Sequence, residues 1–318
     1  SHSGAEANPQ GSKEPAVANR LFDKKTGTYE TDEQYNRRIN TDISLITNKI
    51  KSVTGKSPRA WVWPYGAANG TTLKLAKEHG YKMAFTLNEG LANAAFLDDI
   101  PRVLISDNPS LKRFASQVAQ LREPQTMRVM HVDLDYVYDK DPAQQKRNID
   151  KLIQRVYDMR ISHVFLQAYA DPKGDGNICE LYFPNRWLPM RADLFNYISW
   201  QLQTRAGVTV YAWMPVLAFD LDASIPRVTA WDPKTGRTAI NHENYVRLSP
   251  WDSEARKRIT EIYEDLAKHA SFKGILFHDD AFLTDFEDAS PEALAAYRAA
   301  GLPGSIEQIR SNPQTFER

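Results

Sequence analysis

From residue 127 to residue 301, apolar segments of strand length alternate with segments of helical periodicity, and this alternation constrains the fold more than any other feature. The expected strands are 127–138, 163–170, 208–216 and 274–278. The helices expected to follow them begin at or near Pro142, Arg191, Ser253 and Pro291. Nearly continuous apolar strands joined by helices are typical of a parallel sheet whose faces are covered by helices. The sequence therefore predicts an α/β fold.

Two α/β folds accommodate four consecutive strand–helix units: a doubly wound sheet, and half of an eight-unit (β/α)8 barrel. The turn after the first strand lacks the Gly-x-Gly-x-x-Gly motif of a nucleotide-binding doubly wound fold. Long polar and aromatic segments follow every strand, and the longest runs from Ala218 to Trp251. Because eight-unit barrels carry their chemistry in the loops after the strands, we expect the first four units of a (β/α)8 barrel.

The first 122 residues also alternate between strands and helices. Thr31 and Gln34 form a capping-box signal, and apolar residues then recur at helical spacing until Gly55. Further strands are expected at 60–63 and 83–87, and further helices at 71–79 and 110–121. We expect one α/β domain over residues 1–122 and a second domain over residues 123–318.

Composition argues against several classes of function. Forty Lys and Arg residues balance 40 Asp and Glu residues, which argues against a nucleic-acid partner, since its recognition needs a concentrated basic surface. The single Cys179 excludes an internal disulfide and a cysteine-cluster metal site. No apolar run reaches the ~20 residues that span a bilayer. The chain opens at Ser1 without Met, so we expect a piece cut from a longer protein at both ends.

The strongest chemical signal is an acidic cluster at the end of the fourth strand. Its five carboxylates, with no Lys or Arg among them, are Asp279, Asp280, Asp285, Glu287 and Asp288. Mutual repulsion and partial burial predict a raised pKa for at least one of them, as a general acid needs. Adjacent strand residues point in opposite directions, so we expect Asp279 or Asp280 to be catalytic while the other holds a tyrosine, an arginine or a backbone amide. The alternative is a solvated acidic loop.

A second polar signal lies on the first expected strand. His131, Asp133 and Asp135 alternate along it and would share one face, inside the barrel near its functional rim. We take Asp133 and Asp135 as candidate substrate-binding residues. A hydrogen-bonded structural layer and a metal site are the alternatives.

Aromatic residues occur in the same segments after the strands, among them Tyr169, Trp213 and Tyr245. Each alone is better explained as core, but flat rings beside carboxylates suit the stacking of sugar rings. Glycoside hydrolysis needs two carboxyl groups, or one together with the acetamide of the substrate. An acidic rim further favours a positively charged sugar such as glucosamine. We therefore expect a carbohydrate cleft with Trp213 and Tyr245 as substrate-binding residues.

Long motifs along the whole chain resemble those of the PgaB/HmsF family of poly-β-1,6-N-acetylglucosamine N-deacetylases from biofilm systems, and they occur in the same order as in that family. The motifs are Ser1-His2-x-Gly, Val62-Trp63-Pro64-Tyr65-Gly66, Phe85-Thr86-Leu87, 100–105, 131–139, 211–217 and 274–281. The resemblance implies the later part of a polysaccharide-deacetylase domain, followed by the first half of a (β/α)8 glycoside hydrolase domain.

The resemblance also implies roles for individual residues. His2 matches a ligand of a divalent metal (Zn, Ni, Co or Fe) that activates water in the deacetylase domain, while the remaining metal ligands would precede residue 1. Pro64 and Tyr65 match the motif that lines its substrate groove. In the second domain, Asp279 and Asp280 match the proposed catalytic positions, and Tyr245 matches a groove residue.

The function expected from these observations is a hydrolase that modifies poly-β-1,6-N-acetylglucosamine. The first domain would remove acetyl groups with its metal, and the second would bind and cleave the partly deacetylated polymer. The family context implies a periplasmic, outer-membrane-anchored protein beside an export pore. Two alternatives remain: a scaffold that guides the polymer without cleaving it, and a glycosidase for neutral glucans.

Overall fold

The computed structural model describes residues 5–88, 90–103, 105, 108–120, 126–242 and 245–311. The chain divides into two compact units. Unit 1 comprises Ser1–Leu166, Ala192–Ala212 and Ala267–Gly274, and unit 2 comprises Gln167–Arg191, Trp213–Leu266 and Ile275–Arg318. The domain boundary expected between residues 122 and 123 stays a prediction.

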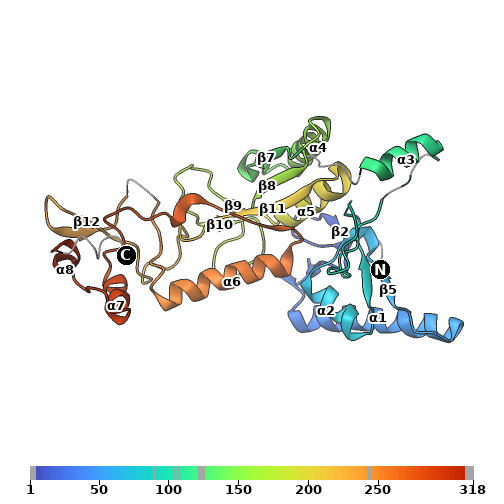
Figure 1. The fold of residues 1–318 in the computed structure, drawn as a ribbon, viewed down its shortest axis with the longest axis horizontal. Helices are drawn as coiled ribbons and strands as arrows, with labels where there is room; N and C mark the ends of the chain where they lie inside the picture. Colours follow the sequence, from blue (N-terminus) through green and yellow to red (C-terminus); the bar gives the residue numbers. More distant parts are fainter. Residues whose placement is uncertain are drawn as a thin grey trace. The chain divides into compact units, whose positions relative to one another are not determined.

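The expected parallel α/β sheet is present. Its strands are β7 (Val129–Val132), β8 (His163–Gln167), β11 (Thr209–Met214) and β14 (Gly274–Phe277). They neighbour one another in the order β7-β8-β11-β14, and β7 pairs in parallel with β8. Figure 1 labels the first three of these strands. A doubly wound sheet reverses its strand order at a switch point, whereas these strands are added in chain order. The sheet therefore has the order of consecutive barrel strands.

Helices connect these strands where the sequence predicts them. They are α4 (Pro142–Asp158), α5 (Phe195–Gln201), its π-helical continuation η3 (Leu202–Ala206), α6 (Ser253–His269) and, after β14, α7 (Pro291–Ala299). The carboxylate of Asp141 caps α4 by accepting the amides of Ala143 and Gln144, as the Asp-Pro start predicts. The helix expected from Arg191 begins only at Phe195. Helix α4 packs against η3 (Figure 1).

The first strand is shorter than expected, and this changes one prediction. Strand β7 ends at Val132, and Leu134–Tyr136 forms the 3-10 helix η2. The Asp133 side chain accepts the backbone amide of Asp135 at 2.8 Å, a local bond that replaces continued strand pairing. The prediction that His131, Asp133 and Asp135 share one strand face is therefore wrong.

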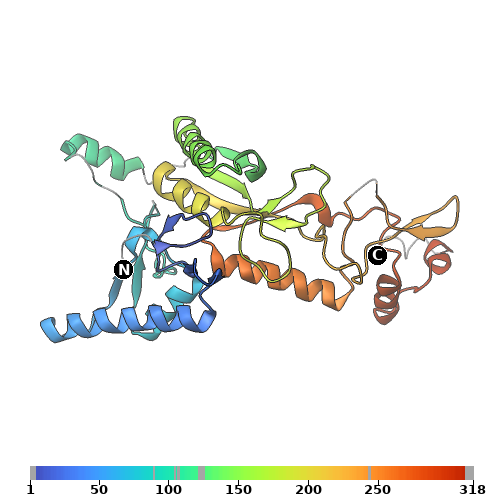
Figure 2. The ribbon, with the colours of Figure 1, turned by 180° about the vertical axis from the view of Figure 1, so that it is seen from behind.

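Unit 1 has its own core around helix α1 (Asp32–Thr54), the long blue helix in Figure 1 and Figure 2. The Thr31–Gln34 capping box is present, and α1 packs against α2 (Gly70–Glu78). Strands β5 (Ala60–Val62) and β6 (Met83–Phe85) pair in parallel. The buried core residues are Tyr35, Ile39, Ile43, Trp63, Ala76, Tyr81 and Ala84.

The remaining elements are short. In unit 1 they are β1 (Ala5–Glu6), β2 (Lys13–Glu14), β3 (Phe22–Asp23), β4 (Thr28–Tyr29), η1 (Pro64–Gly66) and α3 (Leu111–Gln120). In unit 2 they are β9 (Tyr169–Ala170), β10 (Glu180–Leu181), β12 (Ala230–Asp232), β13 (Arg237–Ala239), η4 (Asp279–Ala281) and α8 (Ile306–Ser311). Among the described residues, no helix combines the length and apolarity needed to cross a membrane.

Candidate active site

The two adjacent aspartates after β14 have opposite environments. Asp280 is fully buried, and its carboxylate accepts the backbone amides of Val216, Leu217 and Ala218 at 2.6–3.0 Å. The side chain of Asp279, by contrast, is 80% exposed. One aspartate thus holds backbone amides while the other faces solvent, as the sequence predicts. Of the two, only the Asp279 side chain is accessible from solvent.

One oxygen of Asp279 is held by protein groups. The Tyr245 hydroxyl donates to Asp279 Oδ1 at 3.0 Å, and His278 Nδ1 lies 3.0 Å from the same oxygen. Within the described part of the chain, no hydrogen bond reaches Oδ2. The carboxylate is therefore oriented through one oxygen, and the other is available to a ligand.

His278 lies among three aromatic rings. Trp213 stacks on it with a centroid distance of 5.5 Å and an interplanar angle of 18°, while Tyr169 and Tyr245 contact it edge-on at 6.1 and 5.0 Å. Trp213 and Tyr245 are half-buried, whereas Tyr169 is buried. The site thus combines an exposed carboxylate with partly exposed rings, the pairing that sugar-binding sites use.

Burial raises the pKa of Tyr245, and Asp279 adds to this rise through its hydrogen bond and its charge. The charges of Asp280 and Asp171 act in the same direction. The phenol is therefore kept in its protonated form, which is the form that donates to Asp279.

The loop after Asp280 is less exposed than a solvated acidic loop would be. Glu287 and Arg247 form a buried ion pair at 2.6 Å. Burial alone would raise the pKa of Glu287, but the Thr284 amide and Arg247 outweigh it, so the pKa is lowered. Asp288 accepts the Ser249 hydroxyl at 2.8 Å and is also buried. Glu287 is therefore one carboxylate of the acidic cluster whose pKa is lowered, because a distant arginine that the sequence does not reveal is its partner.

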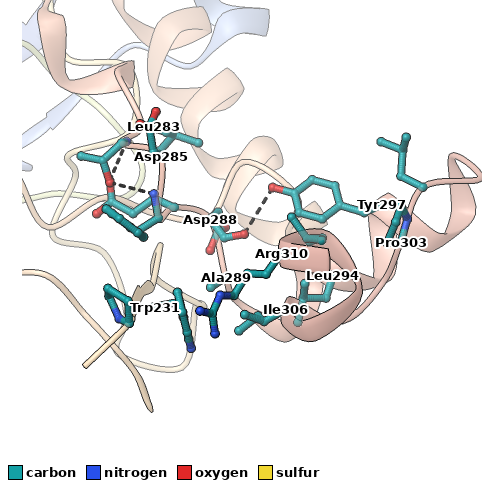
Figure 3. Close-up of a pocket in the computed structure, with 16 residues that line it drawn as sticks. Trp231, Leu283, Asp285, Asp288, Ala289, Leu294, Tyr297, Pro303, Ile306 and Arg310 are labelled. Atoms are coloured by element: carbon teal, nitrogen blue, oxygen red, sulfur yellow. Dashed lines mark hydrogen bonds between the residues drawn. The ribbon is translucent and has the colours of Figure 1, made fainter. Parts of the chain in front are cut away.

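A separate cavity of about 840 Å³ lies in unit 2 (Figure 3). Its walls come from the loop 283–289, from 231–233 and from the segment 294–310. The Tyr297 hydroxyl donates to the Asp288 carbonyl at 3.2 Å, and Arg310 lies over Trp231. Asp279 and Tyr245 do not line this cavity. Its walls are mostly apolar, and the cavity is thus distinct from the polar cluster around Asp279.

The site residues expected in unit 1 lie in local turns of that unit. Pro64 and Tyr65 lie in η1, where Tyr65 has a positive φ of 56° and contacts Trp200 edge-on at 6.4 Å. Asp133 and Asp135 form the local turn at η2. His2 lies outside the described residues, and the described residues contain no group of three or more His, Cys, Asp or Glu that could hold a metal ion.

Sequence reasoning missed His278 and Gly176 as parts of the site. His278 directly precedes the aspartate pair, which was the available signal. Gly176 gave no comparable signal, because its importance comes from a contact with Tyr245, 69 positions further along the chain.

Residues 131–318 match the family model described as hypothetical glycosyl hydrolase family 13, and residues 5–84 match the polysaccharide deacetylase model. The first match spans more than half of the chain, so the chain belongs to hypothetical glycosyl hydrolase family 13. Over all 318 residues it is 51% identical to the poly-beta-1,6-N-acetyl-D-glucosamine N-deacetylases of Escherichia coli strain K12 and Escherichia coli O157:H7. It spans 47% of the length of each relative.

Among solved structures, the chain is similar to the PgaB (BpsB) glycoside hydrolase domain from Bordetella bronchiseptica. The two are 55% identical with a TM-score of 0.55, over 60% of this chain and 55% of that chain. These matches confirm the resemblance to the PgaB family that the motifs indicate, and they confirm the α/β fold class.

Proposed function

We propose that the protein modifies poly-β-1,6-N-acetylglucosamine, and that the Asp279 site binds and cleaves the partly deacetylated polymer. The observation that carries this proposal is the Asp279 carboxylate, which is held through Oδ1 by Tyr245 and open at Oδ2. A fixed, exposed carboxylate beside partly exposed aromatic rings supports glycoside chemistry. Its negative charge favours a sugar that carries an ammonium group.

Within this site we assign different roles to the two aspartates. Asp279 contacts the sugar, and Asp280 holds the backbone at 216–218 against η4. Trp213 and Tyr245 offer ring surface to the polymer. The roles of Asp133 and Asp135 in substrate binding stay predictions.

A second proposal concerns the region that matches polysaccharide deacetylases. We propose that it contributes to metal-dependent N-deacetylation, with Pro64 and Tyr65 at the substrate groove and His2 as one metal ligand. The support is the match over residues 5–84 and the names of the relatives. Among the described residues, no group of three or more His, Cys, Asp or Glu could hold this metal ion. A periplasmic location beside an export pore belongs to the same proposal.

One observation favours the alternative function, a polymer-binding scaffold, for the region that follows residue 122. Asp280 uses its carboxylate for backbone amides, so the pair of adjacent aspartates supplies one exposed carboxylate instead of two. A binding scaffold that guides the polymer requires no second carboxylate, whereas hydrolysis needs a second group or the substrate's acetamide.

Product analysis separates these functions. The full-length gene product is incubated with partly acetylated β-1,6-glucosamine oligomers, and chain lengths are read by mass spectrometry. We expect shortened products, and a loss of at least about a hundredfold in rate for Asp279→Asn. Asp220→Asn, an exposed aspartate paired with Arg227, is the matched control. Binding without shortened products would support the scaffold function. A preference for neutral glucans would support a glycosidase that acts on uncharged polymers.

A further inference from the structure

The loop 171–177 is folded around one carboxylate. Asp171 Oδ2 accepts the Gly176 amide at 2.8 Å, and Asp171 Oδ1 accepts the Asp175 amide at 3.2 Å. Gly174 also donates its amide to the Asp171 carbonyl at 3.0 Å. Three consecutive backbone amides, those of residues 174–176, are thus tied to Asp171, so the position of Gly176 is well defined.

Gly176 lies directly against the ring of Tyr245. A Cβ at this position would lie 2.3 Å from Tyr245 Cδ1 and 2.4 Å from Cε1, closer than any real contact. Its φ of +70° is also one that residues with a side chain rarely adopt. The absence of a side chain therefore makes room for the ring of Tyr245.

Tyr245 is confined by a second contact. The ring of His278 meets it edge-on at a centroid distance of 5.0 Å. With Gly176 and His278 both limiting the ring, the hydroxyl reaches Asp279 Oδ1 at 3.0 Å. A movement of the hydroxyl by about 1 Å away from Asp279 would stretch this bond beyond hydrogen-bonding length.

We infer that the loop closed around Asp171 positions Tyr245, and through it Asp279, with Gly176 as the residue whose missing side chain admits the tyrosine ring. Asp171 and Gly176 are positioning residues, because they act through Tyr245. The inference rests on the proposed function of Asp279, and it goes beyond that function by assigning the orientation of the carboxylate to the loop 171–177, which lies more than 100 positions earlier in the chain.

A double-mutant cycle in the full-length gene product tests this inference. Gly176→Ala displaces the ring, so we expect kcat for oligomer cleavage to fall about tenfold, as for loss of one transition-state hydrogen bond, and KM to rise because the ring also offers surface to the polymer. Tyr245→Phe removes the same bond and should cause a similar loss. In the Tyr245→Phe background, Gly176→Ala should change kcat less than about twofold. Full additivity of the two losses would overturn the inference.

Gly174→Ala is the matched control. Gly174 has a φ of +66° in the same loop, but no heavy atom lies within 4 Å of its Cβ position. This variant therefore introduces the same backbone strain without touching Tyr245, and we expect kcat within about twofold of the original. An equal loss in Gly174→Ala would assign the effect to loop strain and would contradict the positioning role.

A readout without catalysis separates this inference from the proposed function. In protein labelled with ¹³C at the tyrosine ζ carbon, the Tyr245 signal is identified by its absence in Tyr245→Phe. Gly176→Ala should move this signal to the shift of a solvent-exposed tyrosine, and Gly174→Ala should not. If the wild-type protein fails to cleave oligomers but the signal moves, the proposed function fails and the positioning role stands. An unmoved signal would refute the positioning role whatever the activity.

Discussion

Replacing Asp193 by Asn should change the pH dependence of stability of unit 1. Asp193 and Glu14 are both buried, and burial raises the pKa of each, that of Asp193 to about 7. The Asp193 charge raises the pKa of Glu14 further. Tyr29 donates to Asp193 Oδ2 at 2.8 Å, and Asn8 and Asn196 donate to the two oxygens of Glu14. These five side chains join the segment 8–29 to the residues at the start of α5.

The sign follows from the direction of the pKa change. The folded state binds a proton at Asp193 more tightly than the unfolded state does, so this group's contribution is most favourable at low pH and is lost as pH rises. A rise from the ordinary 3.8 to about 7 corresponds to about 4 kcal/mol over the full range, and to about 3 kcal/mol between pH 5 and pH 8. Asn cannot ionise and avoids this loss. Relative to wild type, the Asp193→Asn variant should therefore gain about 3 kcal/mol between these pH values.

Neighbouring groups have pH dependences of their own. Burial and the Tyr29–Asp193 hydrogen bond keep Tyr29 protonated, and burial also raises the pKa of Tyr197. Burial lowers the pKa of His269, whose ring packs on Tyr29, to about 3. Its contribution falls as pH drops below its ordinary 6.5, opposite to the trend of Asp193. Comparing variant with wild type at each pH cancels the contribution of His269.

The protein is equilibrated in increasing urea at pH 5 and at pH 8. Each sample then receives a brief deuterium pulse at one fixed pH, and mass spectrometry of peptides from α5 gives the unfolded fraction. This readout follows unit 1 separately, because a chain with two compact units need not unfold in one step. Asp158→Asn, an exposed aspartate in unit 1, is the control and should give a difference that does not vary with pH. A constant difference between Asp193→Asn and wild type from pH 5 to pH 8 would refute the reasoning.

Two further predictions concern the proposed functions. In the wild type, backbone amides donate to the carboxylate of Asp280, and Asp280→Asn replaces one of its oxygens with an NH2 group that cannot accept them. Unit 2 should therefore lose about 2–4 kcal/mol of unfolding free energy, measured by urea unfolding with Asp220→Asn as control. An unchanged unfolding midpoint would contradict the structural role of Asp280. Chelation of divalent metal, or the substitution His2→Ala, should abolish acetate release by the full-length gene product. Cleavage of oligomers that are already deacetylated should stay intact. Acetate release that survives both treatments would remove His2 and the metal from the proposal.

Local signals in the sequence predicted local structure well. The capping box at Thr31 and the Asp141 cap are both present, because each depends on residues within one helical turn. The same local chemistry explains the error at Asp133. An aspartate that bonds the amide two residues on competes with a strand, and the alternating pattern alone could not show which would win.

Contacts between distant segments could not be predicted in this way. Tyr245 was a candidate for substrate binding, but its bond to Asp279 spans 34 positions and its contact with Gly176 spans 69. The pairing of Glu287 with Arg247, which helps to lower the pKa of Glu287, likewise could not be read from the acidic run alone. Spacing along the chain determines which residues share a helix or a strand. The protonation state and the orientation of a site's side chains depend instead on which helices, strands and loops come together in the fold.

The adjacency of Asp279 and Asp280 has a physical consequence for the site. Asp280 is fixed by three consecutive amides, so the backbone that carries Asp279 is fixed at the same time. Tyr245 then restrains the side chain of Asp279 through Oδ1. With both backbone and side chain restrained before a ligand arrives, the reaction proposed for this carboxylate would need less reorganisation. A buried aspartate beside an exposed one is therefore the arrangement that a preorganised carboxylate requires, and it explains why the two side chains cannot exchange roles.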